Sequence, residues 1–449
     1  MTNISANTPP TGGSFSSPEV LMAVLLTQPA HWHRGRPERV GIGLLGHGTV
    51  GSGVVAILHA QHELLRNEAG VDFDLVHVLI RDAEKPRGTT PALPVLTTDA
   101  DAVINDPSVH VVLECIGGTS AAADYVARAL SLGKHVVTAN KDLLAAHGAE
   151  LDAIADNHGV TLWYEAAVGG AIPIIRLLRE SLAGERIVEI AGVVNGTTNF
   201  ILSAMSAGST YADALKRAQE LGFAEADPRS DVEGWDAAHK LALLSRLAFR
   251  RYVQSTAIAR RGITALSPED VALGKHLGYA LKLLAFARDA EQTLTAAVSP
   301  VFVPSGHLFA QPEGPQCAIR IVGQATGALS FIGTGAGREP TASAMVGDLL
   351  AVLRHLAHGT SFRTNRRTAD VTLTPLDQVR MPHALGLAEG QDVGAARAAL
   401  ERAGYSVRAA EGVPALLFDE LALEDGAVMR VLDEARISAR CMIPIWHDR

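Results

Sequence analysis

A glycine-rich turn near the start of the chain restricts the possible folds more than any other feature. Residues 40–55 read VGIGLLGHGTVGSGVV, an apolar run of strand character followed by glycines and a helical pattern. Gly46 would allow the tight turn, Gly48 would let the backbone approach a pyrophosphate, and Gly51 would let the helix pack closely on the strand. The N-terminus of that helix supplies an anion site. The sequence therefore predicts a dinucleotide-binding turn.

The end of the second predicted strand, Leu75 to Ile80, bears on the choice of cofactor. Proteins that use NAD normally place Asp or Glu there for the ribose hydroxyls. This chain instead has Arg81, Asp82 and then the basic residues Lys85 and Arg87. The basic cluster suits a 2′-phosphate and favours NADP. The alternative that stays open is that Asp82 binds the ribose hydroxyls. The protein would then use NAD, or both NAD and NADP.

Composition narrows the class of protein. The 449 residues are 47% hydrophobic and 19% charged, enough apolar material for about two to four domains. The formal charge of −9 argues against nucleic acid or an anionic membrane as the main partner and favours a small-molecule substrate. The widely spaced Cys115, Cys317 and Cys441 indicate neither a disulfide framework nor a zinc site. We therefore expect a reducing cytoplasm.

The first residues, 1–37, predict a disordered or short helical N-terminal extension. They are rich in Ser, Thr, Pro and Gly, and the first basic residue is Arg34. A signal peptide would begin with positive charge. The apolar piece at 20–26 is too short to span a bilayer.

Residues 38–168 alternate between predicted strands and helices, which indicates an α/β, doubly wound Rossmann dinucleotide-binding domain. The strand at 109–114 leads to Gly117, and the strand at 135–138 leads to Lys141. The carboxyl ends of parallel strands form the ligand-binding edge of such a sheet, so both residues are predicted to lie near the cofactor. A Lys141 that merely faced solvent would oppose the dipole of the helix it begins.

Beyond a hinge-like Gly/Pro segment, residues 169–339 predict an α+β catalytic and dimerisation domain, and a helix within 340–358 is expected to complete the first domain. Strands are predicted at 187–194, 293–303, 318–323 and 328–333, and helices at 199–205, 211–221, 236–247 and 268–286.

The C-terminal residues 366–449 predict a ferredoxin-like βαββαβ module. Its elements are expected at 369–373, 393–403, 406–410, 414–421, 426–435 and 437–445. The order of elements fits a regulatory module as well as a structural or dimerising one.

Residues 218–240 concentrate ionisable groups. The stretch contains six acidic side chains, Asp227 of the Asp227-Pro228 pair among them, and ends at Lys240. Asp236 and Lys240 stand four residues apart on a predicted helix, so they project from one face. Hydride chemistry on an aldehyde needs a proton-shuttling group, and an amino-acid substrate needs carboxylates for its ammonium. At this spacing, Asp and Lys more commonly form an ordinary surface ion pair. The segment alone therefore does not distinguish an active site from a surface ion pair.

With these residues identified, the chain resembles the homoserine dehydrogenase family over about residues 40–356. The positions that match the family signature are Ala218, Gly222, Asp227-Pro228, Asp231, Gly234, Asp236 and Lys240. The resemblance implies reversible, nicotinamide-dependent interconversion of L-homoserine and L-aspartate 4-semialdehyde, a step toward threonine and methionine.

The resemblance also implies roles for single residues. Lys240 takes the acid/base position. Burial would lower its pKa and the carboxylates of Asp231 and Asp236 would raise it, and which effect is larger stays open at the level of the sequence. Lys141 is the second active-site lysine, near the cofactor. Glu225, Asp236 and Thr197 take substrate-binding positions. The matching cofactor contacts are Thr49, Val50, Gly222 and Gly337, which implies a cofactor between the domains.

A monovalent cation, sodium, is a further implication of the resemblance. Its ligands would be the Glu165 carboxylate and the carbonyls of Val168, Gly170 and Ile172, oxygen donors that suit such an ion. The resemblance also implies an ACT-like C-terminal module, but the aspartate-proline-glycine entry to its first helix is missing, which argues against threonine feedback. We expect a homodimer or homotetramer.

Two other classes of protein are alternatives. A semialdehyde-oxidising or acylating dehydrogenase would need a nucleophilic cysteine, and Cys115 is the candidate near the predicted site. A non-catalytic metabolite sensor would not need Lys141 and Lys240. We therefore expect an enzyme with a lysine acid/base.

Overall fold

A computed structural model describes residues 37–84, 95–360 and 369–448. The chain divides into two compact units. Unit 1 comprises Met1–Ser181 and Ala336–Arg367, and unit 2 comprises Leu182–Gly335 and Thr368–Arg449. Residues 1–36 of the predicted extension and the predicted phosphate ligands Lys85 and Arg87 lie outside the described residues.

Unit 1 is built on a six-stranded sheet in the order β3-β2-β1-β4-β5-β6, with every neighbouring pair parallel. This order confirms the predicted doubly wound dinucleotide-binding fold. The strands are β1 Arg39–Leu45, β2 Asp72–Leu79, β3 Val95–Thr97, β4 Val109–Glu114, β5 His135–Thr138 and β6 Leu162–Trp163.

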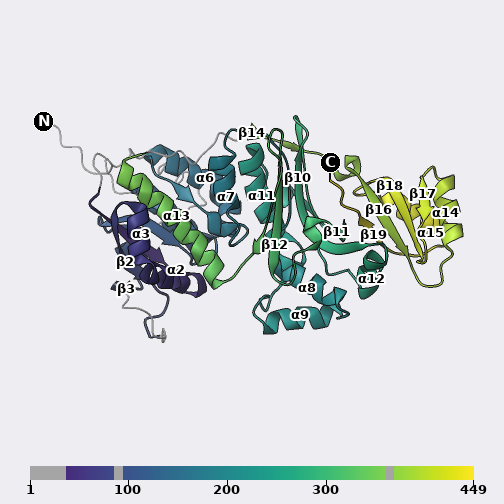
Figure 1. The fold of residues 1–449 in the computed structure, drawn as a ribbon, viewed down its shortest axis with the longest axis horizontal. Coiled ribbons are helices and arrows are strands. Elements are labelled where there is room, and N and C mark those ends of the chain that lie inside the picture. Colours follow the sequence, from purple (N-terminus) through teal and green to yellow (C-terminus); the bar gives the residue numbers. More distant parts are fainter. Residues whose placement is uncertain (1–36, 85–94, 361–368, 449) are drawn as a thin grey trace. The chain divides into compact units, whose positions relative to one another are not determined.

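Helices cover both faces of this sheet. Ile42 and Leu44 of β1 lie in one apolar core with residues of α2 and α13, and α13 packs along α2 and α3 (Figure 1). Gly43 faces the other way, because a Cβ there would meet Val103 of α4 at 2.6 Å. The helices of unit 1 with eight or more residues, together with α4, are α2 Thr49–Ala60, α3 His62–Ala69, α4 Ala100–Ile104, α5 Ser120–Ser131, α6 Lys141–His158 and α13 Arg338–His358.

Unit 2 contains a mainly antiparallel seven-stranded sheet in the order β13-β12-β7-β10-β11-β15, with β9 also paired to β11. Its strands are β7 Ile187–Val193, β9 Ala259–Arg260, β10 Tyr279–Asp289, β11 Thr293–Pro304, β12 Gln316–Gly323, β13 Gly327–Thr334 and β15 Thr372–Leu373. The helices that accompany it are α8 Gly196–Ser206, α9 Tyr211–Glu220, α10 Arg229–Val232, α11 Trp235–Phe249 and α12 Pro268–His276.

Two predicted elements differ from the structure in these units. The helix expected over 268–286 stops at His276, and Gly278, at φ 82°, turns the chain into β10. Strand β10 is buried on both faces, so its apolar run lacks the alternation that separates a strand from a helix. Strand β6 ends at Trp163 and is followed by a 3-10 turn, Glu165–Ala167, although the apolar run at 162–168 predicts a single strand.

The C-terminal residues form a four-stranded antiparallel sheet in the order β17-β18-β16-β19. With α14 Val393–Arg402 and α15 Gly426–Glu434 the element order is βαββαβ, as predicted; the strands are β16 Arg380–Leu387, β17 Val407–Ala409, β18 Ala415–Ala422 and β19 Ala439–Pro444. The first strand was misplaced. Residues 369–373 instead pair elsewhere in unit 2: β14 (Ala369–Asp370) with β8 (Arg251–Tyr252), and β15 with β11.

The C-terminal sheet is joined to the seven-stranded sheet by buried apolar contacts. Trp446, 1% exposed, packs against Phe286 and Phe309 at ring-centroid distances of 5.5 and 5.9 Å. Met381 of β16 belongs to the same core. The C-terminal sheet and the seven-stranded sheet therefore share an apolar core within unit 2.

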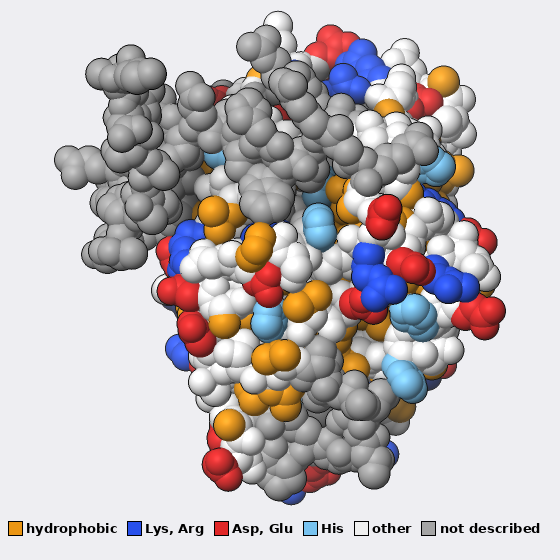
Figure 2. Space-filling model, turned by 90° about the vertical axis from the view of Figure 1, so that its left-hand side faces the viewer, with side chains coloured by type: hydrophobic (Ala, Val, Ile, Leu, Met, Phe, Trp, Pro, Cys, Tyr) orange, Lys and Arg blue, Asp and Glu red, His pale blue; other side chains and the backbone are white. Residues whose placement is uncertain are grey.

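One face of the molecule and the lengths of its described helices bear on the expected absence of a membrane or polyanion partner. On the face drawn in Figure 2, acidic and basic side chains are interspersed with apolar ones. Among the described residues, no helix combines the length and apolarity needed to cross a bilayer.

Candidate active site

The glycine turn between β1 and α2 has the geometry that its sequence predicts. Gly46 has φ 104°, and a Cβ on it would lie 3.0 Å from the Cys115 carbonyl oxygen. A Cβ on Gly51 would lie 2.1 Å from the Gly46 carbonyl oxygen, so a side chain there would separate helix from turn. A Cβ on Gly48, in contrast, would meet nothing within 4 Å. The backbone at Gly48 is therefore open to a close ligand.

Two other predicted cofactor residues start α2. Thr49 is exposed and is the first residue of the helix. The side chain of Val50 packs against the core of unit 1, so its backbone N–H is the group available to a ligand. First-turn N–H groups have no partner inside the helix and point toward an anion site.

The carboxyl ends of β4 and β5 are locked together beside this turn. The buried Glu114 carboxylate accepts hydrogen bonds from the Ile116 N–H at 2.8 Å and the Thr138 hydroxyl. Burial raises the pKa of Glu114, and these hydrogen bonds oppose the shift. The Asn140 side chain caps α6 through the Leu143 N–H and donates to the Gly118 carbonyl at 2.7 Å.

Lys141 and Gly117 are positioned by this arrangement. Lys141 is the first residue of α6, its side chain is 30% exposed, and its Nζ lies 3.8 Å from a carboxylate oxygen of Asp142. Gly117 has φ 72°, and a Cβ on it would meet nothing within 4 Å. Both residues thus stand at the ligand-binding edge of the sheet, as expected.

The remaining predicted cofactor residues of unit 1 are Arg81 and Gly337. Arg81 is exposed and follows β2 closely. Asp82, the alternative ribose ligand, accepts a hydrogen bond from the Glu84 N–H at 2.9 Å, which engages one of its carboxylate oxygens in a local turn. Gly337 precedes α13 with φ 133°.

Lys240 lies in unit 2, in a buried charge network. Its Nζ donates to the Asp236 carboxylate at 2.7 Å and to the Val194 carbonyl at 2.8 Å. Lys240 and Asp236 are only 9% and 4% exposed. The Asn195 amide donates both to Asp236, at 2.7 Å, and to Asp231, at 2.6 Å. The expected pairing of Asp236 and Lys240 on one helical face is confirmed, and the surface alternative is wrong.

The protonation state of Lys240 follows from two opposing effects. Burial lowers the pKa of an ammonium, whereas the carboxylates of Asp236 and Asp231 raise it, and the carboxylates prevail. The pKa of Lys240 is therefore above its ordinary value. Burial and the neighbouring Asp236 raise the pKa of Asp231 as well. Lys240 is an ammonium at neutral pH.

Asn195 was not among the predicted site residues, although it organises the network. Its Oδ1 caps α8 by accepting the Thr198 N–H at 2.8 Å, while its amide nitrogen binds the two aspartates. An asparagine directly before a helical segment is an N-cap signal that was available in the sequence. No local pattern indicates that the same amide contacts residues about forty positions later in the chain.

Two of the residues predicted to bind substrate lie at the start of α8 and in the loop after α9. The Thr197 hydroxyl donates to the Phe223 carbonyl at 2.6 Å, which ties α8 to this loop. Gly222 is exposed with φ 76°, and Glu225 is exposed. Asp227 is also exposed and pairs with Arg229. The structure thus brings Thr197, Asp231, Asp236 and Lys240 together within unit 2.

The predicted cation ligands all lie in the buried segment after β6. Glu165 Oε1 and Oε2 accept the N–H groups of Ile175 and Arg176 at 2.8 and 2.7 Å. Among the described residues, no backbone hydrogen bond is accepted by the Val168 or Gly170 carbonyl, whereas the Ile172 carbonyl accepts the Ile174 N–H.

A second buried acid stands beside Glu165. Asp348 accepts the Glu165 N–H at 2.7 Å and pairs with Arg176 at 3.0 Å. Burial and the nearby Asp348 raise the pKa of Glu165 to about 7. The donor set consists of oxygen atoms only, one carboxylate and three carbonyls, so it fits a hard cation.

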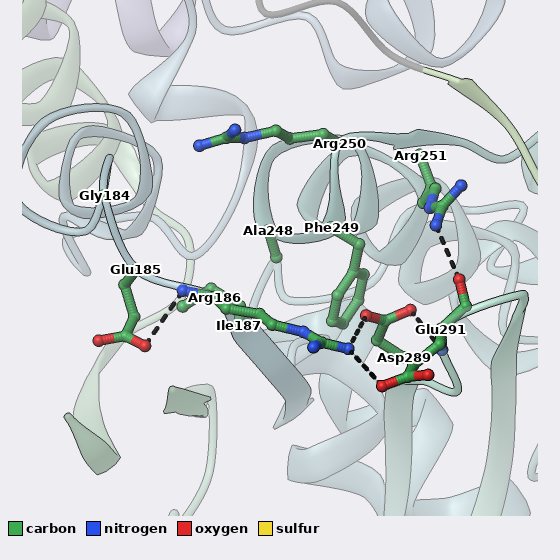
Figure 3. Close-up of a pocket in the computed structure, with 10 residues that line it drawn as sticks. All are labelled: Gly184, Glu185, Arg186, Ile187, Ala248, Phe249, Arg250, Arg251, Asp289 and Glu291. Carbon is green, nitrogen blue, oxygen red and sulfur yellow. Dashed lines mark hydrogen bonds and ion pairs between the residues drawn. The ribbon is translucent and has the colours of Figure 1, made fainter. Parts of the chain in front are cut away.

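A hollow of about 610 Å³ lies elsewhere in unit 2 (Figure 3). Arg186 points across it and pairs with Asp289 and Glu291 at 3.6 and 3.3 Å. Arg251 donates to the Glu291 carbonyl at 2.9 Å. None of the predicted site residues lines this hollow.

A doubly wound sheet with an open glycine turn, in one chain with a buried acid–lysine network, defines a dinucleotide-dependent oxidoreductase. Comparison with known families agrees. A model described as "Homoserine dehydrogenase, NAD binding domain" matches residues 46–165, and one described as "Homoserine dehydrogenase" matches residues 173–350. The chain belongs to the homoserine dehydrogenase family.

Individual relatives cover most of the chain. Homoserine dehydrogenase of Bacillus subtilis (strain 168) is 44% identical over 72% of this chain and 75% of its own length. The crystal structure of a homoserine dehydrogenase from Thiobacillus denitrificans is 37% identical, covers 91% of this chain and 98% of its own, and has a TM-score of 0.82. One from S. aureus, at pH 6.5, is 32% identical with a TM-score of 0.73, over 92% of this chain and 100% of its own.

The cysteine alternative can be tested directly. The Cys115 thiol donates to the Gly46 carbonyl at 3.3 Å, and burial raises its pKa, so a thiolate is disfavoured. We expect Cys115→Ser to keep kcat within about twofold, since a serine hydroxyl can make the same hydrogen bond. Steady-state rates of both proteins would decide this. A loss of a hundredfold or more, with folding intact, would restore the covalent mechanism.

Proposed function

We propose that this chain reduces L-aspartate 4-semialdehyde reversibly to L-homoserine, with Lys240 as the proton donor. The observation that carries the proposal is the buried Lys240 ammonium, held by Asp236 at 2.7 Å. Bound nicotinamide supplies the hydride. A carbonyl that accepts a hydride develops negative charge on oxygen, and a fixed ammonium both stabilises that charge and supplies the proton.

The raised pKa of Lys240 defines its roles in the two directions. In the reductive direction the group starts as an ammonium, ready to donate. In the oxidative direction a proton must first leave Lys240, and the adjacent Asp236 opposes this step electrostatically. The Val194 carbonyl and Asp236 fix the direction of the Nζ–H bonds. Lys141 is proposed as the second active-site lysine, supplied by unit 1.

We also propose that acidic residues select an amino-acid substrate. Glu225 is exposed, and Asp231 is half-buried next to the capped start of α8. Carboxylates bind a substrate ammonium through charge-assisted hydrogen bonds. Asp236 already accepts hydrogen bonds from Lys240 and Asn195. Its proposed role is therefore to keep these two side chains in place beside the substrate. Thr197 would contact the substrate from α8.

NADP is the proposed cofactor. Its pyrophosphate would lie on the open backbone of Gly48 and the first turn of α2, and Arg81 would bind the 2′-phosphate. A solved structure titled "Hyperthermophilic archaeal homoserine dehydrogenase in complex with NADPH", 26% identical with a TM-score of 0.59, supports this choice. Gly117, Gly222 and Gly337 are the proposed further contacts.

Sodium is proposed as a structural cation held by Glu165 and the carbonyls of Val168, Gly170 and Ile172. The buried carboxylates of Glu165 and Asp348 lie close enough for Asp348 to raise the pKa of Glu165, and Asp348 pairs with Arg176 at 3.0 Å. A cation at Glu165 would offset this concentration of negative charge. The ion would fix the segment between β6 and the following helix rather than take part in chemistry.

Assembly, regulation and location complete the proposal. We propose a homodimer or homotetramer, which light scattering would distinguish from a monomer.

The C-terminal sheet is proposed as an ACT-like structural or regulatory module; calorimetry with threonine would test it for an effector site. The cysteines in the described part of the chain are free, which favours a reducing cytoplasm; cell fractionation would check this.

Replacing Lys240 tests the acid/base assignment. We expect Lys240→Ala to lower kcat by about 10²–10⁴-fold, because the proton donor is lost, while the dissociation constant of NADP stays unchanged. NADPH absorbance with semialdehyde, and fluorescence for binding, measure the two quantities. Lys216→Ala, at a lysine whose side chain is 76% exposed, is the matched control. Substantial turnover by a folded Lys240→Ala enzyme would contradict the assignment.

Replacing Arg81 tests the cofactor preference. We expect Arg81→Asp to lower the ratio of kcat/KM for NADPH over NADH by about tenfold or more, since a carboxylate repels the 2′-phosphate and accepts ribose hydroxyls. Arg408→Asp, at an exposed arginine of the C-terminal sheet, is the control. An unchanged ratio would rule out the phosphate-binding role of Arg81.

The cation site predicts a sodium-dependent stability. We expect the thermal midpoint of the wild type to rise by about 2 °C or more in sodium chloride relative to choline chloride of equal strength, because the ion binds the folded state. Glu165→Gln should lose this response, whereas Glu180→Gln, at a partly exposed glutamate, should keep it. Equal responses in Glu165→Gln and the wild type would contradict the site.

A further inference from the structure

Lys282 is a buried lysine that the acid/base chemistry does not use. It lies on β10, is 5% exposed, and is outside the signature positions at 218–240. Its Nζ donates to the Asn199 Oδ1 at 2.7 Å and to the Pro312 carbonyl at 2.7 Å. Burial lowers its pKa to about 8, and Glu313 opposes the shift. The group is therefore still largely an ammonium at neutral pH.

Asn199, on α8, accepts the hydrogen bond from Lys282 and makes further hydrogen bonds of its own. It is 1% exposed. An ammonium can only donate, so Lys282 fixes the Asn199 amide with its oxygen toward β10 and its nitrogen toward the turn before β12. That nitrogen lies within hydrogen-bonding distance of three carbonyls, those of Pro312, Gly314 and Gln316, at 3.1, 2.9 and 3.2 Å. Lys282 and Asn199 together hold the turn 312–316 against α8.

The turn 312–316 in turn touches the start of α8. A Cβ on Gly196 would lie 2.7 Å from the Pro315 carbonyl oxygen, so the turn and the first residue of the helix are in direct contact. Gly196 sits between Asn195, whose amide binds Asp231 and Asp236, and Thr197, whose hydroxyl binds the Phe223 carbonyl. A shift of the turn would therefore move the residues that hold Lys240 and face the substrate.

We propose that Lys282 is a positioning residue, which sets the start of α8 through Asn199 and the turn 312–316 and thereby aligns Thr197 and the Asn195–Asp236–Lys240 network. This inference rests on the proposed function, because it gives Lys282 the task of placing the proton donor. Removing the ammonium leaves the Asn199 and Pro312 oxygens buried with fewer donors. The turn then relaxes, and misplacement of reacting groups by a fraction of an ångström lowers turnover.

The test compares Lys282→Met and Lys282→Gln with the exposed Lys275→Met on α12. Methionine keeps the length without charge or donors, and glutamine restores an N–H donor. We expect Lys282→Met to lower kcat about tenfold or more per folded enzyme, with the dissociation constant of NADPH unchanged within about twofold. Lys282→Gln should retain more activity than Lys282→Met, and Lys275→Met should match the wild type.

A purely structural role gives a different outcome. It would lower the thermal midpoint of Lys282→Met while leaving kcat and the KM for semialdehyde at wild-type values, and that result would overturn the proposal. If Lys282→Met does not fold, Lys282→Gln decides on the same terms. Asn199→Ala and the double variant Asn199→Ala/Lys282→Met complete a double-mutant cycle. A double variant no slower than either single variant supports the proposed chain of contacts, and fully additive losses of activity overturn it.

The proposed function is separated from this inference by two parallel measurements. Absence of semialdehyde reduction by the wild type, or full turnover by Lys240→Ala, would contradict the proposed function itself. Wild-type kcat in Lys282→Met, with Lys240→Ala inactive, would contradict only the positioning role.

Discussion

A buried ammonium group needs nearby carboxylates or other hydrogen-bond acceptors, and this requirement determines how the helices around Lys240 are arranged in unit 2. Lys240 and Asp236 pair in near-complete burial, and Asn195 joins Asp236 to Asp231. Breaking a buried ion pair by removing one partner typically costs about 3–5 kcal/mol. The starts of α8 and α11 and the short helix α10 must therefore keep a fixed mutual arrangement. The same compensation keeps Lys240 charged, which suits a proton donor for a reduced carbonyl.

Unit 1 depends on a different constraint, the absence of side chains at the glycine turn. Gly51 approaches the Gly46 carbonyl more closely than any Cβ would permit, and Gly53 packs in the same way on Ala342 of α13. Close approach brings the first turn of α2 to the sheet edge, where the Glu114 and Asn140 hydrogen bonds hold the ends of β4 and β5. The predicted anion site is thus built from backbone groups, and the proposed role of the exposed Arg81 is to modify its preference.

The C-terminal sheet is more than an appendage on a linker. Its Trp446 enters the core of the seven-stranded sheet, and Arg288 lies over the Trp446 ring while pairing with the buried Glu189. Asp448 accepts from the Trp446 indole and pairs with Arg320. A change in the C-terminal sheet would therefore act on β7, β10 and β12, the strands that also support α8 and Lys282.

The sequence by itself determined the parts that depend on local pattern. It predicted the glycine turn, the limits of β4 and β5, and the pairing of Asp236 with Lys240, since strand ends, glycine positions and i,i+4 spacing are local properties. The tertiary structure alone decided that 279–289 is a strand, that 380–387 begins the C-terminal sheet, and that Asn195 and Lys282 support the site. It also decided the sign of the Lys240 pKa shift, because burial and the distances between charges arise only when distant segments meet.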